Sequence, residues 1–457
     1  MSRFVGMVIA LVGLAVALIG LGAAGYYAAA GLAYLFSLWG LAPQFGAAIA
    51  NLVILLLVVV MVSASLLSVA ERKWSALIQD RIGANRILVA GNPLGGIPYL
   101  IADALKMLTK ERFQPDQASK ILFNLAPVLA FAPIFALFAI VPVGQPLSLG
   151  QILDVQGPVA RVSVALQLAN PDAGLLYLFA ISSLAVYGTS LAGWASNNKF
   201  ALLGGVRAAS QMISYEVSLG LSLVGTMIAF RTLRLEEMVV AQGYASLGAI
   251  PNLGILLQPV GFLIFFASAF AETKRAPFDL PEGESEIVGY FVEYSGMQFG
   301  LMFLAEFVEI VILSGVITAV FLGGWHPIFF EETLKARLTP LAFAAVGAGA
   351  FLGKMVVLMW VQLLIRWVLP RFRYDQIQKL CWKILLPAGL VNIFVTGAAV
   401  LVDPSLRLLA IIGLLELVAM FAITAAVSRA PAAGHGHGAA AHGHSDSHGH
   451  APAAAGH

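Results

Sequence analysis

The chain has 457 residues, of which 60% are apolar and only 11% are charged, whereas soluble domains carry roughly 25% charged residues. This composition excludes an ordinary soluble protein and indicates a membrane protein. The formal net charge of +2 gives no reason to expect a nucleic-acid partner. The single cysteine, Cys381, excludes an intramolecular disulfide framework, a zinc cluster of cysteines and an Fe–S cluster held by this chain alone.

Apolar runs that are long enough to cross a bilayer recur along the chain, since a spanning helix needs roughly 20 mostly apolar residues. The first run is much longer than the hydrophobic region of a signal peptide, which holds roughly 7–15 residues, so we interpret it as a retained membrane segment. The expected fold is all-α, a polytopic membrane helix bundle. Ten candidate spans lie at about 5–28, 46–70, 121–143, 173–193, 208–230, 255–271, 299–322, 342–368, 384–402 and 405–427.

The orientation follows from the distribution of lysine and arginine, which are enriched in cytoplasmic loops. With ten spans, the side of the N-terminus collects 19 of these residues and the opposite side collects six. We therefore predict that both termini are cytoplasmic.

The first long loop follows the second span and begins with ERKWSALIQDRIGANR. Its charged residues are Glu71, Arg72, Lys73, Asp80, Arg81 and Arg86. The next stretch, IPYLIADALKMLTKE, has Leu100, Ala104 and Leu108 at helical spacing, which predicts a short amphipathic helix at the membrane surface. The alternative is simple anchoring of the span by its flanking cations. GNPLGG, between the two, lacks the Lys-Ser/Thr of a phosphate-binding loop.

Glu216 lies inside the predicted span that contains QMISYEVSLGLSLVG. A charged residue at membrane depth costs at least about 2.5–3.5 kcal/mol, so it normally faces the interior of a bundle or water. Glu306 and Glu309, three residues apart on one helix face, and Lys354 interrupt later spans in the same way. We expect Glu216 and Lys354 to be functional. For Glu309, the sequence favours neither a functional nor a structural role.

The segment 271–296, AETKRAPFDLPEGESEIVGYFVEYSG, is unusually acidic for this chain. Pro277 and Pro281 break helical structure there, which predicts an irregular loop. Its apolar residues favour burial, and carboxyl groups in a partly dry cavity have raised pKa values, so they can exchange protons near neutral pH. A solvated acidic loop is the alternative. The acids are Glu272, Asp279, Glu282, Glu284, Glu286 and Glu293.

The C-terminal segment 430–457 consists largely of Ala, Gly and His and holds seven of the eight histidines. Alternating Gly-His favours binding of a soft divalent ion, but a disordered tail is the simpler interpretation, because Gly-rich chains lose much entropy on ordering.

Four segments together resemble the H-type core membrane subunit of proton-pumping NADH:quinone oxidoreductase, respiratory complex I. They are ERKWSALIQDRIGANR, SNNKFALLGGVRAASQMISYEVS (196–218), the acidic segment 271–296 and LPRFRYDQ (369–376). The resemblance covers about residues 46–402 and implies about eight core transmembrane helices. It leaves 1–45 as an extra N-terminal membrane segment, 403–429 as an extra C-terminal membrane helix and 430–457 as the tail.

The resemblance also implies roles for particular residues. Glu71, Arg72, Arg81, Arg86 and Asp279 match residues that contact the quinone. Glu216, Glu272 and Glu306 match membrane acids of the proton path, and Glu282, Glu284 and Glu286 match the loop acids that link the quinone chamber to them. We add Lys354 to the proton path because it is charged inside a span. The span at 173–193 contains no acid, although members of the family carry one more proton-path residue in this region.

The implied activity belongs to a complex and not to this chain alone. Quinone is the expected substrate, while NAD, flavin and Fe–S clusters are expected on other subunits. The expected partners are the other membrane subunits, the peripheral Fe–S subunits and the lipid bilayer, in a bacterial inner (plasma) membrane.

Two alternatives stay open at this point. The first is the homologous membrane subunit of an energy-converting hydrogenase or of a related quinone- or phenazine-linked dehydrogenase. The second is a self-contained secondary transporter, which would show inverted repeats, and the sequence shows no internal repeat. It also lacks a nucleophile–base triad and a dinucleotide-binding motif.

Overall fold

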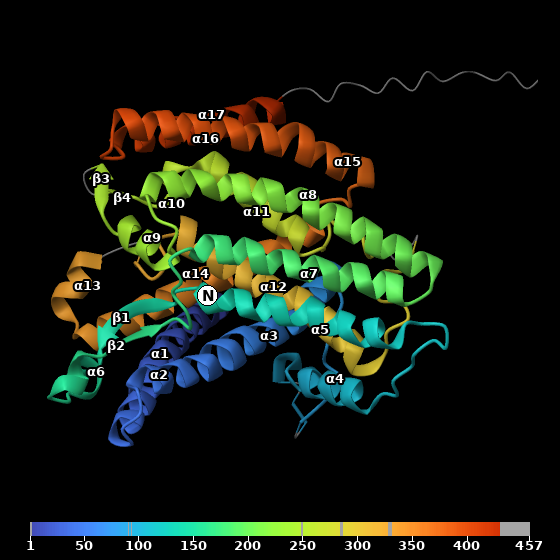
Figure 1. Ribbon diagram of the computed structural model, residues 1–457, viewed down its shortest axis with the longest axis horizontal. Helices are drawn as coiled ribbons and strands as arrows, with labels where there is room; N and C mark the ends of the chain where they lie inside the picture. Colours follow the sequence, from blue (N-terminus) through green and yellow to red (C-terminus); the bar gives the residue numbers. More distant parts are fainter. Residues whose placement is uncertain are drawn as a thin grey trace, which may run out of the picture. The chain divides into compact units, whose positions relative to one another are not determined.

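The computed structural model describes residues 2–89, 91–92, 94–247, 250–283, 287–327 and 331–429. The chain divides into two compact units, 1–416 and 417–457, and the described part of the second unit is the end of the last helix. The predicted His-rich tail, 430–457, and the predicted site residues Glu284 and Glu286 lie outside the described residues. Almost all regular structure is helical (Figure 1).

Seventeen α-helices follow one another along the described residues. They are α1 (Ser2–Leu38), α2 (Pro43–Asn51), α3 (Ser63–Ile78), α4 (Pro98–Thr109), α5 (Lys120–Leu137), α6 (Leu149–Leu153), α7 (Gly174–Ala195), α8 (Lys199–Phe230), α9 (Leu235–Gln242), α10 (Gly254–Leu257), α11 (Pro259–Glu272), α12 (Gly296–Phe321), α13 (Glu331–Arg337), α14 (Pro340–Val368), α15 (Tyr374–Leu380), α16 (Leu386–Val402) and α17 (Arg407–Arg429). Two π-helical stretches, Leu52–Val62 and Cys381–Leu385, make α2–α3 and α15–α16 continuous. Short 3₁₀ turns lie at Leu94–Gly96, Phe138–Ile140 and Pro158–Arg161.

Among the described residues, nine helical segments are long and apolar enough to cross a membrane. They correspond to nine of the ten predicted spans, which confirms the prediction of a polytopic helix bundle. The tenth predicted span, 255–271, is divided between two helices in the structure, and the longer of them falls short of membrane length. Pro259 separates α10 from α11, and α11 has only 14 residues.

Two small antiparallel hairpins were not predicted. In the first, β1 (Gly144–Ser148) pairs with β2 (Ser163–Leu166); in the second, β3 (Ala245–Leu247) pairs with β4 (Ile250–Pro251). Helices anchor the first hairpin, since the Tyr26 hydroxyl donates to Gln145 O (2.7 Å) and Asn51 Nδ2 donates to Ala165 O (2.7 Å). Such strands are too short to leave a clear alternating pattern in the sequence.

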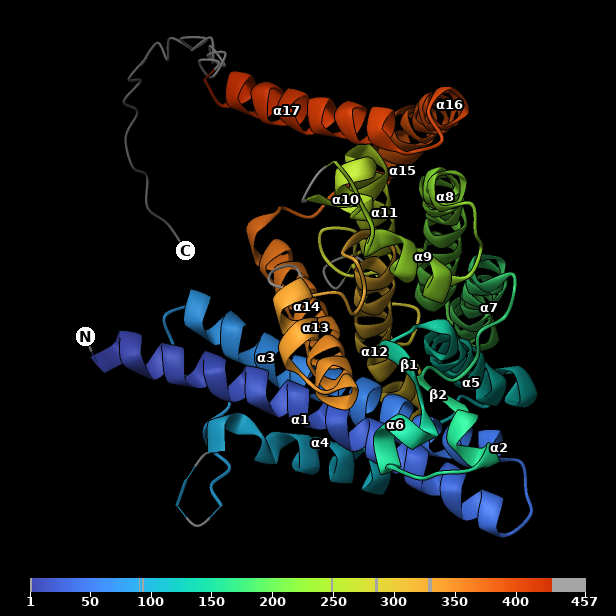
Figure 2. The ribbon, with the colours of Figure 1, turned by 90° about the vertical axis from the view of Figure 1, so that its left-hand side faces the viewer.

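Helix α12 forms the centre of the first unit and packs against α3, α5, α11 and α14 (Figure 2). Every residue from Ala305 to Phe321 is buried, as expected of a helix that is apolar on all sides. Helix α1 packs closely on α14 through small residues: a Cβ added at Gly22 would lie only 2.8 Å from the Ala348 Cβ. The predicted surface helix is α4, whose exposed apolar side chains include Ile101, Leu105 and Leu108.

Candidate functional site

The described parts of the loop between α11 and α12, residues 273–283 and 287–295, are irregular, as the prolines predicted. A buried amide on α8 holds the start of this loop. Gln211 Nε2 donates to Ala271 O (2.7 Å) and to Phe278 O (2.8 Å), so one side chain ties the end of α11 to the loop. A second tie is the ion pair of Arg371 with Asp279 (2.5 Å), from the segment that follows α14.

Two cations of this loop are buried among carboxylates. Arg275 contacts Glu71 in the middle of α3 (2.5 Å) and Glu306 on α12 (3.2 Å). Arg366 on α14 also pairs with Glu71. The Arg275 guanidinium lies 3.9 Å from the centre of the Phe307 ring, which adds a cation–π contact in a largely apolar environment.

The neighbouring Lys274 pairs with Glu309 (3.4 Å). Burial disfavours the charged form of Lys274, but the carboxylates of Glu309, Glu306 and Glu272 outweigh it and raise its pKa. The same two effects act on Arg275: burial disfavours its charged form, but the carboxylates of Glu71 and Glu306 outweigh burial and raise its pKa. Both loop residues therefore remain cations that neutralise the acids around them.

Glu282 is hydrogen-bonded to Glu306, and a bond between two carboxyl groups needs a proton between them. Burial raises the pKa of Glu282 well above its usual range, and the carboxyl groups of Glu306 and Asp279 raise it further, against the opposing effect of Arg275. Glu282 therefore keeps its proton, which it donates to Glu306, at a pH where an exposed glutamate would have lost it.

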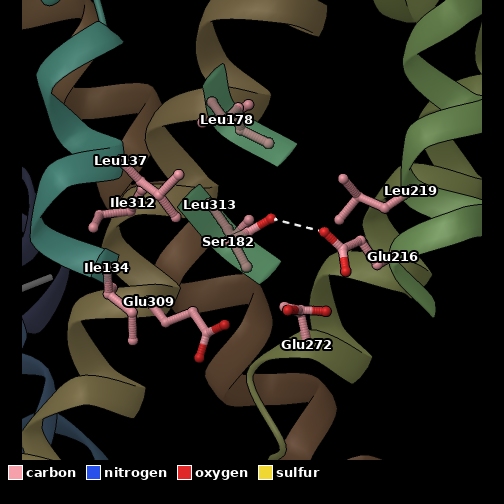
Figure 3. Close-up of a pocket in the computed structure, with 11 residues that line it drawn as sticks. Ile134, Leu137, Leu178, Ser182, Glu216, Leu219, Glu272, Glu309, Ile312 and Leu313 are labelled. Carbon is pink, nitrogen blue, oxygen red and sulfur yellow. Dashed lines mark hydrogen bonds between the residues drawn. The ribbon is translucent and has the colours of Figure 1, made fainter. Parts of the chain in front are cut away.

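Three carboxyl groups from three helices line a narrow cavity: Glu216 from α8, Glu272 from the end of α11 and Glu309 from α12 (Figure 3). The cavity volume is about 20 Å³, enough for about one water molecule. Its other walls are apolar except for Ser182 on α7, whose hydroxyl donates to Glu216 Oε1 (3.4 Å). The cavity is thus far too small for a quinone head group, but its polar groups suit proton exchange.

A separate, wider cavity of about 290 Å³ lies at the first loop. Glu71, Arg72 and Arg81 line it together with Tyr99 and Trp367. The Arg72 guanidinium also pairs with Asp103 on α4 (2.7 Å), and the Arg86 amide donates to the Tyr99 hydroxyl (3.1 Å). Three of the five predicted quinone-contacting residues therefore line this cavity, and the backbone of a fourth, Arg86, contacts its wall at Tyr99. The fifth, Asp279, lies in the acidic loop beside Arg371.

Lys354 lies apart from both cavities. Its ammonium group donates to three carbonyl oxygens that follow the end of α12: Leu322 O (2.7 Å), Gly324 O (2.9 Å) and His326 O (2.7 Å). These are carbonyls without helical partners, at the end of a helix where a cation is favourable. The contacts are those of a helix cap contributed by a neighbouring helix.

Several residues of the site received no role from the sequence: Lys274, Arg275, Arg366, Ser182 and Gln211. A charged residue in a loop costs little when it is solvated, so its burial cannot be inferred from its neighbours in the sequence. One signal was nevertheless present, because a loop with many buried acids needs buried cations to balance them.

Membrane-length helices surround a buried network of ion pairs. These features define the class: a multi-pass membrane protein with ionisable side chains in its interior. The chain matches the NADH dehydrogenase family over residues 50–397. It is 45% identical to an H-type subunit of NADH-quinone oxidoreductase from Geobacter metallireducens, over 75% of this chain and 93% of the relative. It is 43% identical to an H-type subunit of the same enzyme from Syntrophobacter fumaroxidans, over 77% of this chain and 96% of the relative.

The chain therefore belongs to the family of H-type subunits of NADH-quinone oxidoreductase, which are membrane subunits of complex I. Two predictions are thereby confirmed: the resemblance to this family, which was based on four sequence segments, and the assignment of the chain to an enzyme complex. The match begins after α1 and ends before α17. The division into a core domain and extra terminal segments stays a prediction.

Proposed function

We propose that this chain forms part of a quinone chamber at its first loop and couples quinone reduction to proton translocation through its buried carboxyl groups. The quinone-contacting residues are Glu71, Arg72, Arg81 and Arg86, with Asp279 in the adjoining loop. The proton path contains Glu216, Glu272, Glu282 and Glu306, and we add Glu309 to it. Glu284, Glu286 and Lys354 also remain predicted members.

One observation supports this proposal most directly. Glu71 lines the wider cavity and at the same time pairs with Arg275, which pairs with Glu306. A change of charge in the cavity therefore acts on a carboxyl group that shares a proton with Glu282. Over a few ångströms in a medium of low dielectric constant, one new charge changes the energy of such a group by several kcal/mol. That is enough to move a proton.

Further contacts on α12 support the rest of the proposed path. Glu309, one turn beyond Glu306 on α12, pairs with Lys274 and lines the narrow cavity with Glu272 and Glu216. A proton released near the loop thus has acceptors that lead into the membrane interior. We place the electron carriers on peripheral subunits and both termini of this chain on the cytoplasmic side of a bacterial inner membrane.

Replacing Arg275 tests the link between the two cavities. We expect Arg275→Gln to lower quinone-linked NADH oxidation by about tenfold or more, while the assembled complex still reduces ferricyanide with NADH. Arg234→Gln, which removes the ion pairs of Arg234 with Asp172 and Glu237 outside both cavities, is the control and should retain wild-type activity.

Because Arg275→Gln leaves buried acids without a partner, it can also reduce assembly. The double variant Arg275→Gln/Glu306→Gln removes both partners of the pair, which usually costs much less stability. An assembled double variant that reduces quinone and pumps protons at the wild-type rate would show that this link is not part of coupling.

A further inference from the structure

Ser182 holds a special position beside Glu216. It lies on α7, which contains no acid, and it lines the narrow cavity with three carboxyl groups (Figure 3). Within the part of the chain that the structure describes, it is the one side chain hydrogen-bonded to Glu216. The other walls near Glu216 include Leu178 and Leu219, which offer no hydrogen bond.

The Ser182 hydroxyl has a choice of two acceptors. It lies 3.4 Å from Glu216 Oε1 and 3.1 Å from Phe179 O, one turn earlier in its own helix. A hydroxyl group has one hydrogen to donate and two lone pairs that accept. It can therefore donate to the carboxylate, or donate to Phe179 O and accept a hydrogen bond at the same time.

We propose that Ser182 is a positioning residue that satisfies Glu216 in both of its protonation states. When Glu216 is ionised, the Ser182 hydroxyl donates to the carboxylate. When a proton arrives on Glu216, the new carboxyl O–H donates to Ser182 Oγ, and the Ser182 hydroxyl turns to Phe179 O. One proton is added to Glu216, and no covalent bond of Ser182 is broken.

This arrangement has a physical advantage in an apolar cavity. A buried polar group without a partner is costly, so a carboxyl group that has a partner in only one state is held in that state. A hydroxyl that reverses the direction of its hydrogen bond stabilises both states and leaves the helices in place. The proton itself need not pass through Ser182, because the cavity has room for about one water molecule between the carboxyl groups.

The chain offers a matched control at the next position. Ser183 is on the same helix, but its hydroxyl donates only to carbonyls of that helix, Phe179 O (3.0 Å) and Ala180 O (3.1 Å), and it does not line the cavity. Ser183→Ala removes the same atom as Ser182→Ala without touching Glu216. The two variants differ only in the feature that the inference requires.

The inference rests on the proposed proton path. The experiment measures proton pumping as a function of pH, in membranes that contain the whole complex, and normalises it to the amount of assembled complex. We expect Ser182→Ala to lower pumping about fivefold, the equivalent of one hydrogen bond, and to change the pH profile. Ser182→Thr, which keeps the hydroxyl, should restore both, and Ser183→Ala should match wild type. In a Glu216→Gln background, Ser182→Ala should cause no further loss.

Three results would overturn the inference: wild-type pumping and pH profile in Ser182→Ala, equal losses in Ser182→Ala and Ser183→Ala, or a further loss on top of Glu216→Gln. If Ser182→Thr does not assemble, two other variants still test the role of the hydroxyl: Ser182→Gly, which also lacks it, and the double variant Ser182→Ala/Glu216→Gln. Failure of the proposed function looks different, because Glu216→Gln itself would then pump normally. If Glu216→Gln fails to pump while Ser182→Ala pumps, only the role of Ser182 is wrong.

Discussion

At the scale of single residues, buried charge is balanced locally. Arg275 lies between Glu71 and Glu306, and Lys274 contacts Glu309. Each cation lowers the cost of ionised carboxyl groups that would be unstable alone in an apolar interior. Glu282 is different, because it shares a proton with Glu306 and does not depend on a cation alone.

The raised pKa of Glu282 predicts how heat stability depends on pH. The unfolded chain releases this proton above the usual glutamate pKa of about 4.3, but the folded chain keeps it up to the raised pKa. As pH rises through that window the unfolded state binds fewer protons, so wild type loses stability. Glu282→Gln removes this loss. The temperature of half-inactivation should fall less in Glu282→Gln than in wild type between ~pH 5 and ~pH 8; parallel curves would refute the shared proton.

Lys354 gives a second prediction at this scale. If it caps α12, Lys354→Arg keeps the charge and the donors, and the complex should assemble and pump. Lys354→Met leaves three carbonyls without these donors and should lower the amount of assembled complex, at a cost of about 2 kcal/mol or more. A titrating role predicts the reverse, because arginine does not release its proton: Lys354→Arg would then assemble but fail to pump.

The acids of the site could be predicted from sequence and its cations could not. Glu216 and Glu306 stand out because a charge inside an apolar helix is expensive and therefore rare. Lys274 and Arg275 belong to a loop, where charge is ordinary, and only packing against α3 and α12 buries them. Ser182 carries no signal at all, because a serine in a membrane helix usually bonds to its own backbone.

At the scale of elements, two loops far apart in the sequence form one site. The first loop lines the wider cavity with Arg81, beside Arg72 on α3, and the acidic loop provides the cations and Glu282. Helices join them: Glu71 from α3 meets Arg366 from α14, 295 residues away. The sequence predicted both loops, but their meeting depends on the packing of α3, α12 and α14, which no local pattern encodes.

The first loop can be tested by truncating a side chain that lines the cavity. Arg81 is exposed and its guanidinium donates only to the neighbouring Gln79 side chain (2.7 Å), so its removal should not disturb folding. We expect Arg81→Ala to lower NADH:quinone activity about tenfold, the scale of one charge-assisted hydrogen bond, with ferricyanide reduction unchanged. An equal fall in both activities would place Arg81 outside the quinone chamber.

The short turn between the last two helices resolves an ambiguity of the sequence. The candidate spans 384–402 and 405–427 are separated by only two residues, Asp403 and Pro404, which is compatible with a tight hairpin or with one broken unit, and the structure has two helices separated by a turn. The Ser405 hydroxyl and amide and the Leu408 amide donate to the Asp403 carboxylate, and these hydrogen bonds lower the pKa of Asp403. Asp403 therefore caps the start of α17.

At the scale of the whole molecule, the helix count sets the topology. If α11 crosses the membrane together with the nine longer helices of the described residues, the segments number ten, and the 19-to-six distribution of cations then predicts that both termini are cytoplasmic. Cys381, the chain's single cysteine, is completely buried, so an added cysteine can be labelled selectively. A cysteine added after His457 should react with a membrane-impermeant reagent only in inverted vesicles. Reaction in intact cells stripped of their outer membrane would contradict the topology.

The central claim is that the buried carboxyl groups couple quinone reduction to proton translocation, and Glu216 tests it most directly. Glu216→Gln keeps the shape of the side chain and its contact with Ser182 but removes titration. The measurement is proton pumping together with NADH:quinone activity in membranes, normalised to assembled complex. The proposed path predicts that both fall strongly while assembly is retained, with partial recovery in Glu216→Asp. Wild-type pumping by assembled Glu216→Gln would contradict it.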